Sequence, residues 1–437
     1  MKGKTVSVLV VVAVFLQFFV NVTIVKSMGM LLVAMRDEFT TDTWILGSVF
    51  ALIECISDLL SPIAGPIGKR IGIRPVAMFG GVMVTVGFIT ASQSTNVLQV
   101  ALSLNVLIAI GYSFVNVLSR AALGQHFDDR NFALASGIAQ TGASFSLVAM
   151  PPLIQLFLNT YGWRGTMLLL GSIGGHLVVC GALLIPPPTM RDANSKRGYL
   201  PLSATREPTG TSENLQSGRG VLAPVKSLCQ NVAKVFDLSL MMDYNFWIVT
   251  FIYVVTRVTR GAWIIYFVPH AVSKGFSADS AAIMVTAAGL GHLGGVLLVS
   301  VALFKEMVTS TRAMLIVIVL IATSLFIDPW MAAGWMMSAN AVLFMATMGA
   351  VFALGDVMVK EFFGYGKMAG AYGWMGATSG IFRFFSGFIP GWIYDHTGGY
   401  DRAFIIMGGI QIVTVCPLLV KILHSYCSQQ RRRNKAT

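Results

Sequence analysis

Charged residues are scarce in this sequence: Asp, Glu, Lys and Arg make up 11% of its 437 residues. A soluble globular domain carries about 25%, so a water-soluble fold is excluded. Hydrophobic residues reach 55%, which indicates an integral membrane protein whose main partner is the lipid bilayer. Catalytic motifs are also missing: the sequence has no Gly-x-Ser-x-Gly, His-Glu-x-x-His or P-loop pattern, so nothing argues for an enzyme.

Paired cysteines are absent too. The five cysteines show no paired spacing: Cys55, Cys180, Cys229, Cys416 and Cys427. They predict neither a disulfide framework nor a metal site, and no cofactor is expected. The net charge of +12 is interpreted by its location along a membrane chain, and not as a sign of nucleic-acid binding.

Long apolar runs are what the sequence has in abundance. They predict an all-α membrane protein with twelve transmembrane helices in two six-helix halves. The expected spans cover residues 6–35, 44–67, 76–91, 97–123, 132–157, 166–185, 245–269, 280–304, 313–327, 331–356, 369–394 and 403–424. We therefore predict a first half at 1–187, a polar linker at 188–243, a second half at 244–424 and a basic tail at 425–437.

The distribution of basic residues predicts the orientation. Most of the 31 Lys and Arg residues fall on one side of the predicted spans, in the N-terminus, the 188–243 linker, the even-numbered loops and the tail. Because cytoplasmic loops are enriched in Lys and Arg, we expect both termini and the linker to be cytoplasmic.

Ionisable residues inside the spans are the candidate site, because a charge at that depth is costly and usually functional. We identify four deep cations, Lys26, Arg257, Arg260 and Arg383, and two deep acids, Glu54 and Asp58. Arg257 and Arg260 share one face of their helix, and Glu54 and Asp58 share one face of another. Two positive charges remain uncompensated, which favours binding of a small organic anion such as a carboxylate.

Lys26 leaves alternatives open. Its side chain could extend towards the nearer membrane interface, although nine residues separate it from the end of the predicted span. It could instead be neutralised by Glu54 or Asp58 in a structural ion pair. The third interpretation places it in a cavity, where its ammonium group meets the substrate.

The loop after the second span resembles the signature of the major facilitator superfamily, in which two six-helix halves rock around a central site. The matching residues are Gly65, Arg70, Gly72 and Arg74. Lys69 occupies the position where that signature has an acid. The resemblance implies that this gating loop controls opening, with its contact to the rest of the chain altered at Lys69.

Four segments resemble the monocarboxylate transporter family more closely. They are Trp44-Ile45 with Pro62 and the gating loop, His126-Phe127 with Arg130, Gly162-Trp163-Arg164, and Gly391 to Gly398. The span-one lysine of its proton-coupled members matches Lys26, followed likewise by Ser27. The resemblance implies a plasma-membrane carrier of small organic anions that works by alternating access. It also implies an accessory single-span membrane subunit.

Proton coupling is where residues and resemblance differ. Proton-coupled members carry an Asp and an Arg one turn apart in span eight, where this sequence aligns His292 and Val296. The remaining proton-coupling candidates are Glu54 and Asp58, followed by His292. Two other functions stay open: a facilitative carrier of a neutral or zwitterionic solute, and a non-transporting receptor on the same fold.

Overall fold

The computed structural model describes residues 3–41, 43–187 and 236–422. Most of the predicted linker and the predicted basic tail therefore lie outside the described residues. The helices are α1 (Gly3–Phe39), α2 (Thr43–Ile71), α3 (Ile73–Ser92), α4 (Val97–Leu102), a π-helix η1 (Ser103–Ile108), α5 (Ala109–His126), α6 (Asp129–Leu183), η2 (Leu238–Met242), α9 (Tyr244–Ser273), α10 (Ala278–Phe304), α11 (Ser310–Ile327), η3 (Asp328–Trp330), α12 (Gly334–Thr397) and α13 (Asp401–Val413).

Ten helices in the described ranges are long and apolar enough to cross a membrane. Two of them are too long for one crossing: α6 has 55 residues and α12 has 64, whereas about 20 residues span a bilayer. Each is broken by one glycine with a left-handed backbone, Gly162 (φ 65°) in α6 and Gly364 (φ 68°) in α12. Glycine adopts this conformation without steric cost. Each break falls between two predicted spans, so the twelve-span prediction is confirmed.

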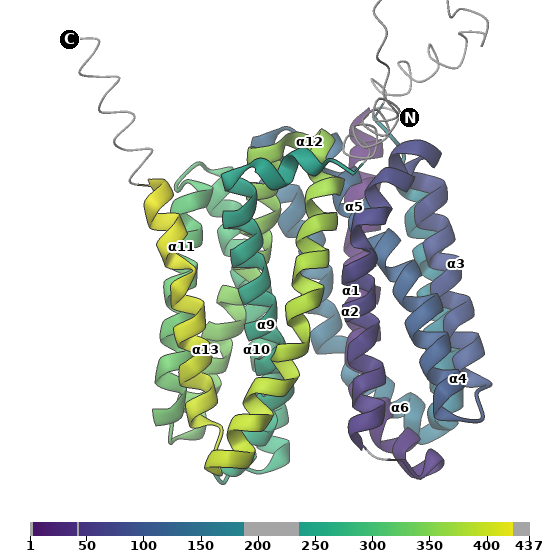
Figure 1. The fold of residues 1–437 in the computed structure, drawn as a ribbon, viewed down its shortest axis with the longest axis vertical. Coiled ribbons are helices and arrows are strands. Elements are labelled where there is room, and N and C mark those ends of the chain that lie inside the picture. Colours follow the sequence, from purple (N-terminus) through teal and green to yellow (C-terminus); the bar gives the residue numbers. More distant parts are fainter. Residues whose placement is uncertain (1–2, 42, 188–235, 423–437) are drawn as a thin grey trace, which may run out of the picture.

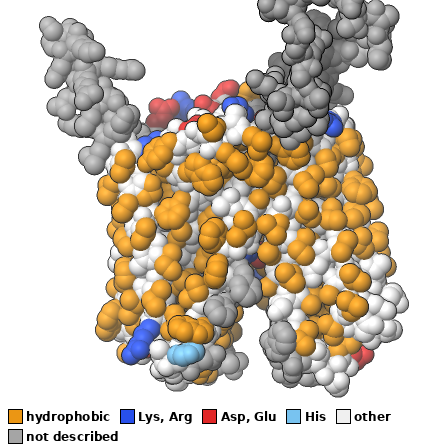
Figure 2. All heavy atoms as spheres, in the orientation of Figure 1, with side chains coloured by type: hydrophobic (Ala, Val, Ile, Leu, Met, Phe, Trp, Pro, Cys, Tyr) orange, Lys and Arg blue, Asp and Glu red, His pale blue; other side chains and the backbone are white. Residues whose placement is uncertain are grey.

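The helices form two bundles that stand side by side (Figure 1). One contains α1 to α6 and the other α9 to α13, which confirms the predicted two-half architecture. The first turn of α1 and the end of the last helix lie at the same face, called here the termini face. Hydrophobic side chains cover the flanks of both bundles (Figure 2), as expected for surfaces that meet lipid.

The two halves touch at the termini face. Lys360 on α12 donates to the carbonyl oxygen of Phe127 and lies 3.3 Å from Asp129, both of the first half. Arg130 of α6 lies 3.3 Å from Glu306, just after α10. At the opposite face a hollow separates the halves (Figure 2). The chain is therefore closed at the termini face and open at the other, and we call this hollow the vestibule.

Candidate functional site

A cluster of buried charges joins the two halves. The carboxylate of Asp58 receives Arg257 Nη1 on one oxygen at 3.0 Å and Arg383 Nη1 on the other at 2.8 Å. Arg383 also donates through Nη2 to Glu54. Arg257 donates in addition to the hydroxyl of Tyr253 at 2.6 Å. One acid on α2 thus holds two guanidinium groups, one from α9 and one from α12.

Close helix packing places these groups within reach. A Cβ added at Gly376 of α12 would lie 2.8 Å from Ser61 Oγ, and one added at Gly380 would lie 3.1 Å from the carbonyl oxygen of Cys55. Small residues let helix backbones approach closely. Arg383 follows Gly380 by three residues on the same helix, so this contact brings its guanidinium group to the acids of α2. Helices α2 and α12 therefore pack closely at these two glycines.

Lys26 and Arg260 have no acidic partner among the described residues. The charges of the two residues are close enough to interact electrostatically. The proposed ion pair of Lys26 with Glu54 or Asp58 is not formed, because both acids are engaged by arginines. The predicted surplus of two positive charges is present in this cluster.

Arg260 contacts an aromatic ring and lies near a histidine. Its guanidinium group lies over the ring of Phe352, 5.3 Å from the ring centroid, and its Nε atom is buried without a hydrogen-bond partner. His292 of α10 lies within electrostatic range of Arg260 and shares a 2.8 Å hydrogen bond with Ser144 of α6. Because α10 and α6 belong to different halves, that hydrogen bond joins the halves next to the charge cluster.

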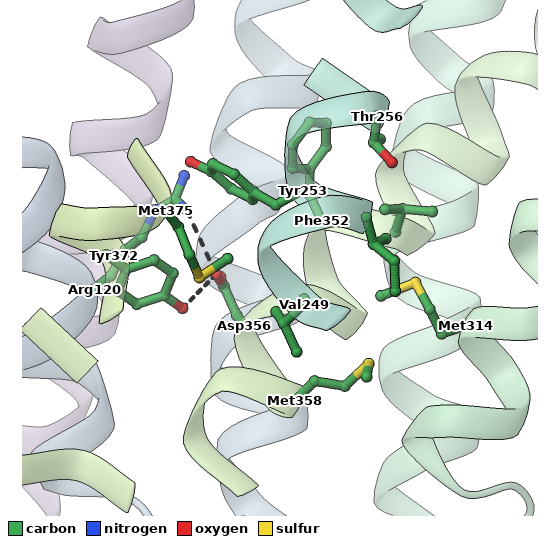
Figure 3. Close-up of a pocket in the computed structure, with 13 residues that line it drawn as sticks. Arg120, Val249, Tyr253, Thr256, Met314, Phe352, Asp356, Met358, Tyr372 and Met375 are labelled. Carbon is green, nitrogen blue, oxygen red and sulfur yellow. Dashed lines mark hydrogen bonds and ion pairs between the residues drawn. The ribbon is translucent and has the colours of Figure 1, made fainter. Parts of the chain in front are cut away.

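A further ion pair between the two halves was not predicted from the sequence. Arg120 of α5 lies 3.6 Å from Asp356 of α12, and both side chains are largely buried. Tyr372 donates to the same carboxylate at 2.7 Å (Figure 3). The count of two deep acids and four deep cations was therefore wrong. Both residues lie near the ends of predicted spans, where the sequence does not distinguish a buried charge from one in the adjoining loop.

The gating loop has an unexpected partner. Lys69 donates to the carboxylate of Asp237, which lies in the described end of the predicted linker. Gly370 of α12 allows this approach, because a Cβ there would lie 2.6 Å from Asp237 Oδ2. The neighbouring Phe236 accepts a 2.8 Å hydrogen bond from Trp374 of α12. The linker end thus connects the gating loop of the first half to the second half.

The rest of the gating loop forms a tight turn. Gly65 packs against Ala369, with an added Cβ 3.3 Å from its backbone, and Gly72 has a φ of 108° that favours glycine. Arg70 and Arg74 are exposed.

Reversing the charge at Lys69 tests this contact. Because the pair is partly exposed, it contributes at most about 1 kcal/mol, so we expect Lys69→Asp to change solute uptake by up to about fivefold. The double variant Lys69→Asp with Asp237→Lys should restore uptake. Arg74→Asp, an exposed change in the same loop, is the control. Equal loss in the single and double variants would show that the pairing has no role.

Comparison with known proteins decides the family. Residues 13–327 match the family model described as Major Facilitator Superfamily. The chain belongs to the major facilitator superfamily. Within this superfamily it is similar to monocarboxylate transporter 12 of Xenopus laevis, with 25% identity covering 90% of this chain and 84% of the relative. It is also similar to monocarboxylate transporter 13 of Rattus norvegicus, with 26% identity covering 92% and 85%.

A solved structure with the same fold is the proton:xylose symporter XylE. The TM-score is 0.69 and the match covers 95% of each chain, at 14% sequence identity. The relatives of this superfamily member are transporters, and the chain is a secondary carrier similar to monocarboxylate transporters rather than an enzyme.

Proposed function

We propose that this chain carries small organic anions, most simply monocarboxylates, across a membrane by alternating access. One observation carries the proposal: Lys26 and Arg260 form no ion pair among the described residues, whereas the two acids of the central cluster, Glu54 and Asp58, are paired with arginines. Two deep positive charges without an ion-pair partner are costly in a membrane protein. A substrate carboxylate would supply the missing charge, and both an ammonium and a guanidinium group bind it well. The names of the relatives support the same substrate class.

The transport cycle follows from the two halves. We propose that residues 1–187 and 244–424 rock about the central cluster, with 188–243 as the cytoplasmic linker between them. With both termini in the cytoplasm of a plasma-membrane protein, the vestibule opens to the outside (Figure 2) and the termini-face contacts close the inside. An accessory single-span subunit is a further proposal, resting on the monocarboxylate transporter resemblance alone.

The proposal is tested with purified full-length protein in liposomes. We expect uptake of labelled propionate above that of protein-free vesicles, and no uptake of propionamide, which has the same shape without the charge. Uptake of the amide as well would favour the facilitative carrier of neutral solutes. Binding of propionate without net uptake would favour the receptor.

Proton coupling is tested in the same vesicles under an imposed pH gradient. Coupling needs a group that changes its charge during the cycle, and the structure ranks the candidates by their partners. Asp58 is held by two arginines, whereas Glu54 is held by one and its side chain is 23% exposed. We therefore expect Glu54→Gln to weaken a gradient response more than His292→Gln does. A full response in Glu54→Gln, Asp58→Asn and His292→Gln would exclude all three candidates.

A further inference from the structure

We propose that Arg120 heads a second carboxylate-binding subsite, which takes organic acids with an apolar body. It lies between the central cluster and the termini face, and it shares only Tyr253 and Phe352 with the contacts described for that cluster. The inference rests on the proposed function and narrows its substrate class. Four observations carry it: a pocket, the unused donors of Arg120, the other hydrogen-bond donors to Asp356, and the apolar walls.

Figure 3 shows the pocket, which adjoins the central cluster through Tyr253 and Phe352. Its lining comes from α5, α9, α11 and α12: Arg120, Val249, Ile252, Tyr253, Thr256, Met314, Val351, Phe352, Gly355, Asp356, Met358, Tyr372 and Met375. Tyr253 forms one wall, and its hydroxyl accepts the hydrogen bond from Arg257. Because α9 runs from the termini face inward, Tyr253 and Val249 lie one and two turns nearer that face than Arg257. A substrate leaving the central cluster towards the termini face meets this pocket next.

Arg120 has donors to spare. Its guanidinium group is packed between the rings of Phe18 and Tyr372, 5.2 Å from each centroid, which fixes its plane. Nη1 makes one long contact of 3.6 Å with Asp356, and the buried Nε has no hydrogen-bond partner in the described structure. A guanidinium group offers five N–H donors in a planar fork that matches a carboxylate. The edge that carries Nε is therefore unpaired, and because Nε is buried in this state, a ligand would reach it when the surrounding helices move.

Asp356 has hydrogen-bond donors besides Arg120. Its carboxylate receives hydrogen bonds from Ser136 at 3.0 Å, Gln140 at 2.7 Å and Tyr372 at 2.7 Å. These three donors are neutral, so Arg120 remains the counter-ion of the carboxylate in this state. They keep the oxygens of Asp356 hydrogen-bonded, so a ligand carboxylate can compete for Arg120 without leaving that acid unsatisfied.

The other lining residues indicate which kind of ligand the pocket would accept. They are apolar, with Val249, Ile252, Val351 and three methionines, and methionine adapts to irregular shapes. Tyr253 can donate its hydroxyl proton to the same carboxylate, because towards Arg257 it acts as acceptor. The walls thus favour a carboxylate on an aliphatic or aromatic body, such as phenylacetate, over a neutral amide, once the pocket widens from the about 20 Å³ that it has in this state.

Gly355 allows a test that spares the fold. A Cβ at Gly355 would meet no atom within 4 Å, so the first side-chain carbon of Gly355→Leu has room beside the pocket, and leucine favours the helix over glycine. Gly366 is equally free on the same helix but outside the pocket, so Gly366→Leu is the matched control. For the charge, Arg120→Gln is compared with Arg120→Lys and with Arg312→Gln, at an exposed arginine in the first turn of α11.

The experiment measures half-saturation for phenylacetate and propionate in inside-out and right-side-out vesicles from cells that express the full chain. Vesicles from cells without it give the diffusion background. Losing one charge-assisted hydrogen bond costs about 1.5–3 kcal/mol. We therefore expect Arg120→Gln to raise half-saturation for phenylacetate by about tenfold or more from the termini face, and by less than about twofold from the opposite face. Arg120→Lys should recover part of the loss. Gly355→Leu should raise the half-saturation concentration for phenylacetate and leave that for propionate unchanged.

The outcomes separate the two proposals. If wild type transports both acids but Arg120→Gln and Gly355→Leu behave like their controls, the subsite is overturned and the proposed function stands. If Arg120→Gln fails to fold, Gly355→Leu alone decides, because it retains every charge. Equal weakening of phenylacetate from both faces would place the subsite in the central cluster and overturn this inference. No transport of either acid by wild type would overturn the proposed function, and the subsite with it.

Discussion

Lys26→Gln is expected to lower propionate uptake by about 10- to 150-fold while the protein still folds and reaches the membrane. The estimate is the loss of a charge-assisted hydrogen bond, about 1.5–3 kcal/mol, expressed as a ratio of binding constants. Folding should survive because Lys26 has no ion pair to lose among the described residues. Removing its charge also relieves the electrostatic repulsion with Arg260. Uptake in proteoliposomes, normalised to folded carrier, is the measurement.

The control for this change is Lys305→Gln, at an exposed lysine just after α10. Arg260→Gln should resemble Lys26→Gln, since Arg260 likewise has no acidic partner in the described part of the chain. Normal uptake by a well-folded Lys26→Gln would remove Lys26 from the site. A loss of folded protein instead of activity would mean that Lys26 has a structural counter-ion.

Asp58→Asn is expected to have the largest effect on stability. Asp58 is the only acid in the described structure that contacts both Arg257 and Arg383, and its side chain is 5% exposed. Removing one partner of a buried ion pair costs about 3–5 kcal/mol, because the other charge stays buried and uncompensated. The yield of monodisperse protein and its Tm in detergent should both fall. Glu54→Gln should lower the stability less, because Arg383 retains its ion pair with Asp58 and because Glu54 is more exposed.

Asp129→Asn is the matched control for Asp58→Asn, because Asp129 is 74% exposed and Lys360 is its one ion-pair partner among the described residues. A well-folded Asp58→Asn with an unchanged Tm would show that the two arginines do not need this acid. Added propionate offers a further check. If it binds the charge cluster, it should raise the Tm of the wild type and raise it more in Asp58→Asn, where more cations lack a partner.

The sequence by itself determined the class and the number of spans. Hydropathy and length suffice for this, because lipid accepts only long apolar helices with satisfied backbones. The boundaries inside α6 and α12 were also predictable, since Gly162 and Gly364 lie between apolar runs and are the residues that turn there. The candidate cations and acids followed from the same physics, because a deep charge stands out against an apolar run.

Only the tertiary structure decided which charge meets which. Asp58 and Arg383 are 325 residues apart, and Arg257 is 199 residues from Asp58. Helix periodicity shows which residues share a face, but not which face of another helix lies opposite. The sequence therefore left open whether Lys26 pairs with Glu54 or Asp58 or extends to the membrane interface. The structure argues against the ion pair, because Glu54 and Asp58 are paired with arginines.

The same reason explains what was missed. Arg120 and Asp356 stand near span ends, where a charge can reach water in one tertiary arrangement and be buried in another. Here α5, α6 and α12 pack together at the closed termini face and bury both side chains. Likewise, Lys69 binds Asp237 because the absence of a side chain at Gly370 leaves room for the Asp237 carboxylate. Local sequence determines helices and their depth, whereas burial between the halves depends on how the two bundles close.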